Sequence, residues 1–272
     1  MIALQAISRE TEDAALSYLR RDPYLNVFII HALAYDRAAQ SRDNLIVAAD
    51  PSGVAGVAYY GRQLAIAADA SAIAPFAELY KQRGGANMIV GARATLRAFW
   101  RLVRPWHPKP RLVRERQLVM MVDRSSLREY DHGVLVRHAR LDDAGGVAES
   151  SAAMIEQELG YASTVATSRF SQAVRRMIER RLWWVGTIGG QLCFFCNVGP
   201  WCERTVQLQG VWTPPHLRRR GLATAALGAI CDRLLAESPS VSLYVNDFNT
   251  AAIALYRRVG FRHVGDFQTL LF

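Results

Sequence analysis

Residues 213–227, TPPHLRRRGLATAAL, place three arginines and a glycine directly before an alanine-rich helical pattern. The first amides of a helix have no acceptor within the helix, and the helix dipole adds partial positive charge, so an anion can bind there. Gly221 permits backbone torsions and a close approach that a side chain would hinder. The segment predicts an anion-binding loop, and the alternative is a solvated basic loop with an ordinary glycine turn.

A second segment, residues 243–267, lies beyond the helix that the loop precedes and begins within the next expected strand. Asn249 is a good N-cap residue, and Ala252 and Tyr256 lie three and seven positions after it on the same helix face. A lone tyrosine at such a position usually packs in the core with its hydroxyl on a backbone partner. Here a polar side chain, a small side chain and a phenol follow an anion loop, which favours the wall of a ligand site.

Together the two segments resemble the GNAT superfamily of acetyl-CoA-dependent N-acetyltransferases. Arg218, Gly221 and Ala223 fit that family's Arg/Gln-x-x-Gly-x-Gly/Ala signature, whose backbone amides bind the pyrophosphate of coenzyme A. Residues 249–261, NTAAIALYRRVGF, fit the family's second segment, in which the asparagine contacts the cofactor arm and the tyrosine often protonates the leaving thiolate. The resemblance covers about residues 133–272. The whole chain resembles the group in which a degenerate GNAT-like lobe precedes an intact one.

This resemblance implies direct transfer of the acetyl group of acetyl-CoA to a primary amine of a small molecule, peptide or protein, without a metal. Tyr256 is the implied general acid. Backbone groups of Val211 and Thr213 are expected to pair with the pantetheine arm as an added strand would, and an amide near Val211 to polarise the thioester carbonyl. The implied cofactor-binding residues are Val211, Thr213, Arg218, Arg219, Arg220, Gly221, Leu222, Ala223, Thr224, Asn249, Ala252 and Tyr256.

The general base is less well determined. The acceptor amine, with a pKa of about 10, must lose a proton to attack the thioester. Many GNAT enzymes carry a carboxylate on the strand before the loop, but Gln207 and Gln209 stand there and cannot usefully accept a proton. Glu156 or Glu158, or a water chain, is the preferred base. His216 is a weaker candidate, because a loop histidine beside arginines is usually solvated.

The rest of the chain predicts an α/β (α+β) fold of two GNAT-like lobes. Its 272 residues suffice for two domains, and the polar residues 122–133 read as a linker. We therefore expect a degenerate domain at 1–128 and an intact domain at 129–272, each a mixed, mostly antiparallel sheet flanked by helices. The tails of the two lobes suggest a duplication, because AFWRLV at 98–103 matches ALYRRV at 254–259.

Apolar periodicity places the individual elements. The expected helices span 73–82, 94–103, 144–156, 168–180, 222–237 and 249–259. The expected strands span 45–49, 56–60, 64–68, 88–90, 134–138, 182–188, 191–198, 205–212 and 241–245, with a last strand ending at Phe272. In the second lobe the resemblance implies that the strands at 205–212 and 241–245 splay apart and admit the pantetheine arm.

The composition limits the kinds of partner that the chain can bind. The net charge of +9 suits an anionic small molecule as well as a nucleic acid. A nucleic-acid reading rests mainly on residues 97–116, where aromatic and basic side chains alternate; we disfavour it because the arginines elsewhere are interspersed with carboxylates. The apolar run at 26–34, NVFIIHALA, falls short of the roughly 20 residues of a membrane span.

The four cysteines, Cys193, Cys196, Cys202 and Cys231, are expected to be buried free thiols in a cytoplasmic protein. The expected partners are acetyl-CoA and an amine acceptor, without a membrane. The sequence leaves open the acceptor, the preference for longer acyl-CoAs and the oligomeric state, a homodimer included. The alternative function is a non-catalytic acyl-CoA-sensing or partner-binding protein, in which the degenerate lobe contacts the partner.

Overall fold

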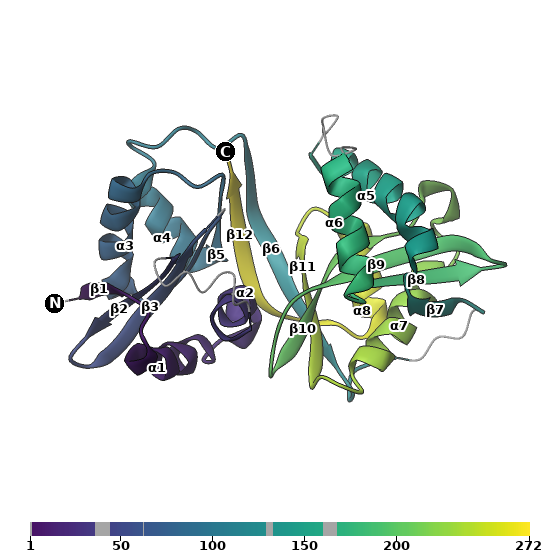
Figure 1. The fold of residues 1–272 in the computed structure, drawn as a ribbon, viewed down its shortest axis with the longest axis horizontal. Coiled ribbons are helices and arrows are strands. Elements are labelled where there is room, and N and C mark those ends of the chain that lie inside the picture. Colours follow the sequence, from purple (N-terminus) through teal and green to yellow (C-terminus); the bar gives the residue numbers. More distant parts are fainter. Residues whose placement is uncertain (1, 36–43, 62, 129–132, 160–167) are drawn as a thin grey trace.

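The structure is a computed structural model of the chain. It describes residues 2–35, 44–61, 63–128, 133–159 and 168–272, and of Glu158 and Leu159 it describes the backbone alone. In the described residues, twelve strands form one mixed sheet in the order β1-β2-β3-β4-β5-β12-β6-β11-β10-β9-β8-β7, with helices on both faces (Figure 1).

The two halves of the chain contain the same order of elements. The first half comprises β1 (Ala3–Ala6), α1 (Arg9–Leu19), α2 (Pro23–Ala34), β2 (Leu45–Asp50), β3 (Gly53–Tyr60), β4 (Leu64–Ala68), α3 (Ala70–Arg83), β5 (Met88–Ala92), α4 (Arg93–Val103) and β6 (Leu112–Asp123). The second half comprises β7 (Leu135–His138), the 3-10 turn η2 (Leu141–Asp143), α5 (Ala144–Leu159), α6 (Ser168–Glu179), β8 (Trp183–Ile188), β9 (Gln191–Cys202), β10 (Thr205–Trp212), the 3-10 turn η3 (Pro215–Leu217), α7 (Leu222–Leu234), β11 (Ser240–Asn246), α8 (Thr250–Val259) and β12 (Arg262–Leu271). This repeated order agrees with the duplication suggested by the sequence.

Most predicted elements are confirmed within a few residues, and β4 and β10 have the predicted bounds. Helix α7 is shorter than expected, because it ends at Leu234 and residues 235–238 form turns. Elements β1, α1, α2 and β6 were not among the expected helices and strands. The expected fold class is confirmed, with one addition: the sheets of the two lobes are joined edge to edge into one.

The join is made by an exchange of the last strand of each half. β6 ends the first half, yet it pairs with β11 of the second half from Ser240↔Asp123 to Asn246↔Gln117. β12 ends the second half, yet it pairs with β5 of the first, as in Phe267↔Ala92. β6 and β12 also pair with each other, and Figure 1 shows them side by side between the two halves. The domain boundary near residue 128 remains a prediction, and the sheet runs across it.

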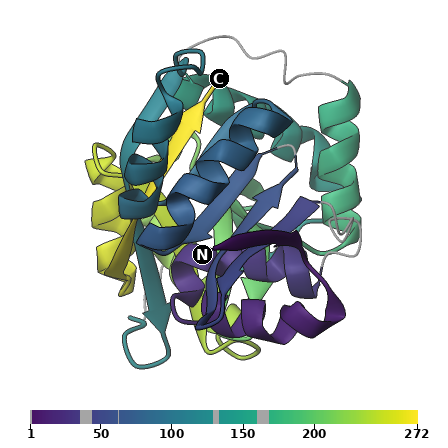
Figure 2. The ribbon, with the colours of Figure 1, turned by 90° about the vertical axis from the view of Figure 1, so that its left-hand side faces the viewer.

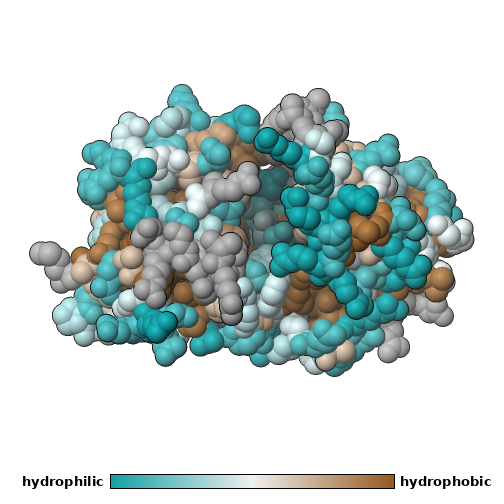
Figure 3. Space-filling model, viewed as in Figure 1, coloured by the Kyte–Doolittle hydropathy of each residue, from teal (hydrophilic) through white to brown (hydrophobic). Residues whose placement is uncertain are grey.

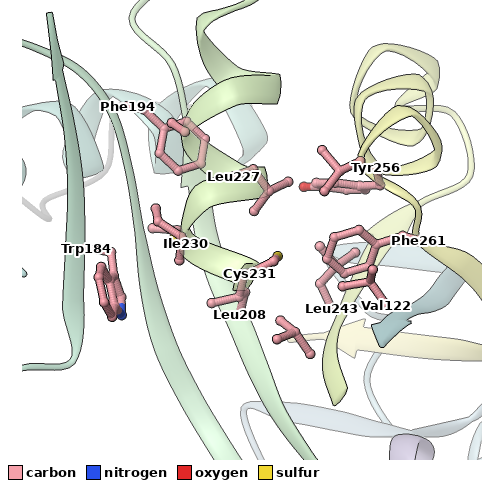
Figure 4. Close-up of a cluster of buried hydrophobic side chains, with 14 of the residues drawn as sticks. Val122, Trp184, Phe194, Leu208, Leu227, Ile230, Cys231, Leu243, Tyr256 and Phe261 are labelled. Atoms are coloured by element: carbon pink, nitrogen blue, oxygen red, sulfur yellow. The ribbon is translucent and has the colours of Figure 1, made fainter. Parts of the chain in front are cut away.

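Each face of the sheet carries one helix pair per half. In the first half, α3 and α4 cover one face, where Phe76 and Phe99 are fully buried, and Figure 2 shows the two helices side by side. α1 and α2 cover the other face around Ile30 and Leu33. In the second half, α7 and α8 cover one face, and α5 and α6 cover the other. The core beneath α7 and α8 includes Leu227, Ile230, Leu243 and Tyr256 (Figure 4).

The parallel strand pairs of the two halves differ. In the first half, β4 and β5 pair from Leu64↔Ile89 to Ile66↔Gly91. Their backbones are so close that a Cβ on Gly91 would lie 2.6 Å from the Ile66 carbonyl oxygen. In the second half, the register of β10 and β11 ends after Val206↔Val241 and Gln207↔Ser242. The expected splay is therefore present in the second half.

A bulge in β10 contributes to this splay. The β9–β10 register shifts between Gln209 and Trp212, and Gly210 within the bulge has a φ of 58°. The positive φ favours glycine, and a Cβ at Gly210 would lie 2.9 Å from the Asn197 Oδ1 atom, so that side chain would have to shift to admit it. A bulge bends its strand and raises the local twist, which turns the end of β10 away from β11.

Other predicted features have clear outcomes. The four cysteines are buried free thiols, as expected, and burial raises the pKa of Cys193, Cys196, Cys202 and Cys231 above that of an ordinary thiol. Among the helices described, none combines the length and the apolar character needed to cross a membrane.

Candidate functional site

The N-terminus of α7 has the geometry that the anion-loop prediction requires. Gly221 adopts the left-handed conformation with a φ of 78° and a ψ of −14°, directly before the first helical residue. The helical hydrogen bonds begin with the amides of Thr224 and Ala225, which donate to the Gly221 carbonyl at 3.0 and 3.1 Å. The amides of Leu222 and Ala223 precede that first bond, so they occupy the positions where a helix binds an anion.

The three arginines of the loop differ in their surroundings. The guanidinium carbon of Arg218 lies 4.5 Å from the centroid of the Trp212 ring. Its Nε atom donates to the Thr213 carbonyl at 3.0 Å, and its Nη2 atom donates to Oε1 of Gln157 on α5 at 3.3 Å. All three arginines are exposed to solvent. The printed contacts distinguish Arg218, which ties the loop to the end of β10 and to α5.

A cavity of about 580 Å³ opens where β10 and β11 diverge. Its walls include Gln207 to Val211 of β10, Leu243 to Asn246 of β11, and Asn249, Ala252 and Tyr256 around α8. The opposite wall comes from the first half of the chain, chiefly from α2. Figure 3 shows the surface hollowed between the two halves. The second predicted segment therefore lines a cavity that both halves enclose.

The predicted face of α8 is in place. The Asn249 side chain caps the helix, because its Oδ1 atom accepts from the Ala252 amide at 3.2 Å. Tyr256 is buried, with its ring 5.7 Å from that of Phe261. Figure 4 shows its hydroxyl directed toward Leu227 on α7. Tyr256 thus packs in the core and also contributes to the cavity wall, so it combines the two alternatives that its position suggested.

Of the predicted bases, Glu156 and His216 do not line the cavity. Glu156 lies exposed on α5 and does not line it, and the side chain of Glu158 lies outside the described residues. His216 is exposed on η3 and is also absent from the lining. The side chain that α5 contributes is Met154. Among the described residues that line the cavity there is no Asp or Glu, and Gln207 lies there buried.

Sequence reasoning missed the contribution of the first half. From α2 come Tyr24, Leu25, Val27, Phe28 and His31, and β6 adds Arg114, Gln117 and Val119. The apolar run 26–34 had been weighed only as a membrane segment. The missed signal stands before it: Asp22 accepts from the Leu25 amide at 3.4 Å, and Pro23 occupies the first helical position. Asp followed by Pro is a typical helix start.

His31 makes a definite contact across the two halves. Its Nδ1 atom lies 3.2 Å from the carbonyl oxygen and 3.3 Å from the amide nitrogen of Trp201 on β9. The centroids of the two rings are 4.0 Å apart. The Tyr35 ring stacks with that of His31, with centroids 5.8 Å apart, and also lies 6.0 Å from the Trp201 ring. The imidazole is therefore held in position at the cavity wall by a strand of the second half.

Elsewhere in the described residues, no three His, Cys, Asp or Glu side chains are grouped so that they could hold a metal ion.

Two segments of the chain match known family models. Residues 154–261 match the model described as the acetyltransferase (GNAT) family. Residues 46–146 match a domain of unknown function, DUF4081. No curated protein matches the sequence significantly. The GNAT match contains the anion loop and helix α8, and it ends within the second segment at residue 261.

Solved structures share the fold along nearly the whole chain. An acetyltransferase from the GNAT family of Colwellia psychrerythraea is 12% identical, with a TM-score of 0.61 and coverage of 99% of this chain and 100% of that one. A GCN5-related N-acetyltransferase from Sphaerobacter thermophilus is 16% identical, with a TM-score of 0.62 and coverage of 98% and 94%. A tandem GNAT protein from the clavulanic acid biosynthesis pathway is 14% identical, with a TM-score of 0.55 and coverage of 100% and 98%.

These structural matches show the fold, and the family match lies in the half that carries the splayed strands and the anion loop. Residues 154–261 thus match the GNAT family, residues 46–146 match a domain of unknown function, and the chain as a whole shares its fold with two-lobed GNAT proteins.

Proposed function

We propose that this protein transfers the acetyl group of acetyl-CoA directly to a primary amine that binds between its two halves. The observation that carries the proposal is the cavity that opens where β10 leaves β11 and that reaches Tyr256. The corresponding strands of the first half stay paired, so the second half alone provides the opening.

The residues around the opening fit acetyl-CoA. Beyond Gln207 the described register of β10 has no partner on the β11 side, so backbone groups near Val211 and Thr213 can pair with the pantetheine arm. The amides of Gly221, Leu222 and Ala223 would bind the pyrophosphate, beside the predicted Thr224, with Arg218, Arg219 and Arg220 adding positive charge. Asn249 and Ala252 line the cavity beside the arm's expected course.

The reaction needs three contributions from the chain. An amide near Val211 would donate to the thioester oxygen as charge develops on it. Tyr256 would protonate the departing thiolate, a step that a positioned acid accelerates by roughly 10²- to 10⁴-fold. The attacking amine must also lose a proton. The predicted Glu156 is exposed and lies outside the cavity lining, so in this structure it would need a water chain to serve as that base.

The acceptor would lie against the first half of the chain. Tyr24 and Phe28 of α2 face the cavity together with Tyr244 of β11, so apolar and aromatic surface meets the acceptor. Arg114 is the one Arg or Lys among the described lining residues. The four buried free thiols suit a reducing cytoplasm, where we place the activity.

Release of free thiol from acetyl-CoA tests the proposal, with glycinamide, tyramine, spermidine and a tetra-alanine peptide as amines. We expect amine-dependent thiol release by the wild-type protein and its loss in Gly221→Val, which removes the anion loop. Acetyl-CoA binding without thiol release on any amine would instead support an acyl-CoA-sensing protein. Absence of acetyl-CoA binding would reject both functions.

A further inference from the structure

We propose that His31, contributed by the degenerate N-terminal lobe, is the general base that accepts the proton of the acceptor amine. The inference rests on the proposed acetyl transfer and adds a catalytic role for the lobe that lacks the anion loop. It is carried by the position of His31 on the cavity wall and by the contacts that hold its ring against β9.

The chemistry of the lining leaves few groups that can take a proton near neutral pH. No Asp or Glu is among the described residues that line the cavity. The strand positions nearest the thioester carry Gln207 and Gln209, whose amides are not bases. Imidazole is the side chain whose ordinary pKa, about 6.5, lies close to the operating pH of such a step. Of the described lining residues, only His31 carries one.

The contacts of His31 also prepare the ring for this role. The Trp201 carbonyl and amide both face Nδ1, at 3.2 and 3.3 Å, and the tautomer decides which of them bonds to it. We assign the tautomer with its proton on Nδ1, in which that nitrogen donates to the carbonyl and the basic lone pair is on Nε2. After proton uptake, the same carbonyl continues to accept from Nδ1 and stabilises the imidazolium. The arrangement follows the general pattern in which a second group fixes the tautomer and orientation of a catalytic histidine.

Several charged or titratable groups share the cavity with His31. They are Arg114 on β6, Tyr24 on α2, Tyr244 on β11 and Tyr256 on α8. Against the ring itself pack Trp201 of β9 and Tyr35 at the end of α2. The nearby ion pair Arg20–Glu203, between the end of α1 and the turn after β9, is exposed to solvent. None of the described lining groups is a carboxylate that would compete with the imidazole for the proton.

The proton balance of the step is as follows. The ammonium group of the acceptor gives one proton to Nε2 of His31, and the freed amine forms the C–N bond to the thioester carbon. When the C–S bond breaks, the thiolate takes a proton from the Tyr256 hydroxyl. The second proton lost by the nitrogen returns to the Tyr256 oxygen, and His31 releases its own proton to solvent. The net products are the acetamide, coenzyme A thiol and one proton.

Replacement of His31 by Asn tests the role, because an asparagine amide can still bond to the Trp201 backbone but is not a base. With the first of the four named amines that the wild-type protein acetylates, we expect kcat to fall by about 10²- to 10⁴-fold. The acetyl-CoA Kd and the Tm should change little. The rise of kcat/KM with pH that accompanies deprotonation of a general base should be present in the wild-type protein and absent in the variant. Imidazole added to His31→Ala should restore part of the rate.

His263→Asn is the matched control, since this histidine is exposed on β12 and bonds to Asp266 at 2.9 Å. It should retain wild-type turnover. If His31→Asn keeps the wild-type rate and pH profile, the role of His31 is wrong while acetyl transfer stands. If kcat falls but the low-pH limb persists, His31 only supports the local structure and the proposal is again overturned. If the wild-type protein acetylates none of the amines, the proposed function fails, and the role of His31 fails with it.

Discussion

Arg218 is stacked on Trp212, with its guanidinium carbon 4.5 Å from the ring centroid, while its Nη2 atom reaches Gln157 on α5. The first arginine of the loop signature is thus part of the packing between β10, the anion loop and α5. Its planar fork stacks on the indole ring and bonds to two groups, which a flexible surface arginine does not do. Both Arg218 and Arg219 are exposed to solvent, so Arg218 is distinguished by its stacking and its two bonds rather than by burial.

This difference predicts unequal effects of two charge-equivalent substitutions. Arg218→Ala should raise the acetyl-CoA Kd by about tenfold, equivalent to about 1.4 kcal/mol, because both the loop order and a charge are lost. Arg219→Ala should raise it by about threefold or less, because only an exposed charge is removed. Isothermal titration calorimetry measures both. Equal effects would mean that the loop acts only through its net charge.

Gly221 should be the most sensitive position of the loop. Its φ of 78° lies in the left-handed region, where a β-branched residue costs roughly 1–2 kcal/mol, and relaxation of that strain would move the first amides of α7. We expect Gly221→Val to abolish measurable acetyl-CoA binding in the same titration. Far-UV circular dichroism should show that the fold is retained. Tight binding by a folded Gly221→Val protein would contradict the assignment of the anion site.

Tyr256→Phe separates turnover from binding. The substitution removes one hydroxyl while the ring keeps its packing against Phe261, so stability and acetyl-CoA affinity should change little. Turnover should fall by roughly 10²-fold or more if the hydroxyl protonates the thiolate. Steady-state kinetics with a fixed amine give kcat, and calorimetry gives the Kd. Unchanged kcat would remove Tyr256 from the mechanism.

Gly260 should be a structural requirement at the join between the halves. Its φ is 112°, and a Cβ there would lie 1.9 Å from the carbonyl oxygen of Ser126, just after β6. Gly84 is a matched control: it also ends a helix with a positive φ of 90°, but a Cβ there meets nothing within 4 Å. We expect Gly84→Ala to cost about 1 kcal/mol of unfolding free energy and Gly260→Ala to cost about 3 kcal/mol or more. Equal losses in urea unfolding would show that the backbone near Ser126 moves aside freely.

The ends of β6 and β12 predict a pH-dependent contribution to stability. The hydroxyl of Ser125 and the guanidinium of Arg262 bond to Asp123 and lower its pKa below the ordinary value. A carboxyl whose pKa is lower in the folded state stabilises the fold above its unfolded pKa of about 3.9, and the effect is lost as pH falls below that value. Because Arg262 is half exposed, we expect about 1 kcal/mol at most.

Unfolding of the wild-type protein and Asp123→Asn by urea at pH 7 and at pH 3 measures this contribution. The difference in unfolding free energy between the two proteins should be present at pH 7 and should shrink at pH 3. A difference that is the same at both pH values would assign the effect of the substitution to packing rather than to the carboxylate charge.

The amino-acid sequence by itself determined the elements and the local motifs. Periodicity identified most helices and strands, because the burial of one face depends on residues that are near in sequence. The left-handed Gly221 and the Asn249 cap were also foreseeable, because a turn or a cap involves only a few consecutive residues. The resemblance to the GNAT superfamily could be recognised from the sequence for the same reason, because it rests on two short segments.

Only the tertiary structure decided which strands and walls come together. β6 and β12 each could have closed the sheet of its own half, and their exchange depends on pairing between residues more than 100 positions apart, as in Leu271↔Leu112. It likewise decided that α2 faces the splayed strands of the other half, and that Glu156 faces solvent while His31 lines the cavity. The apolar pattern of a helix shows that one of its faces is buried. Which element covers that face depends on packing across the whole sheet.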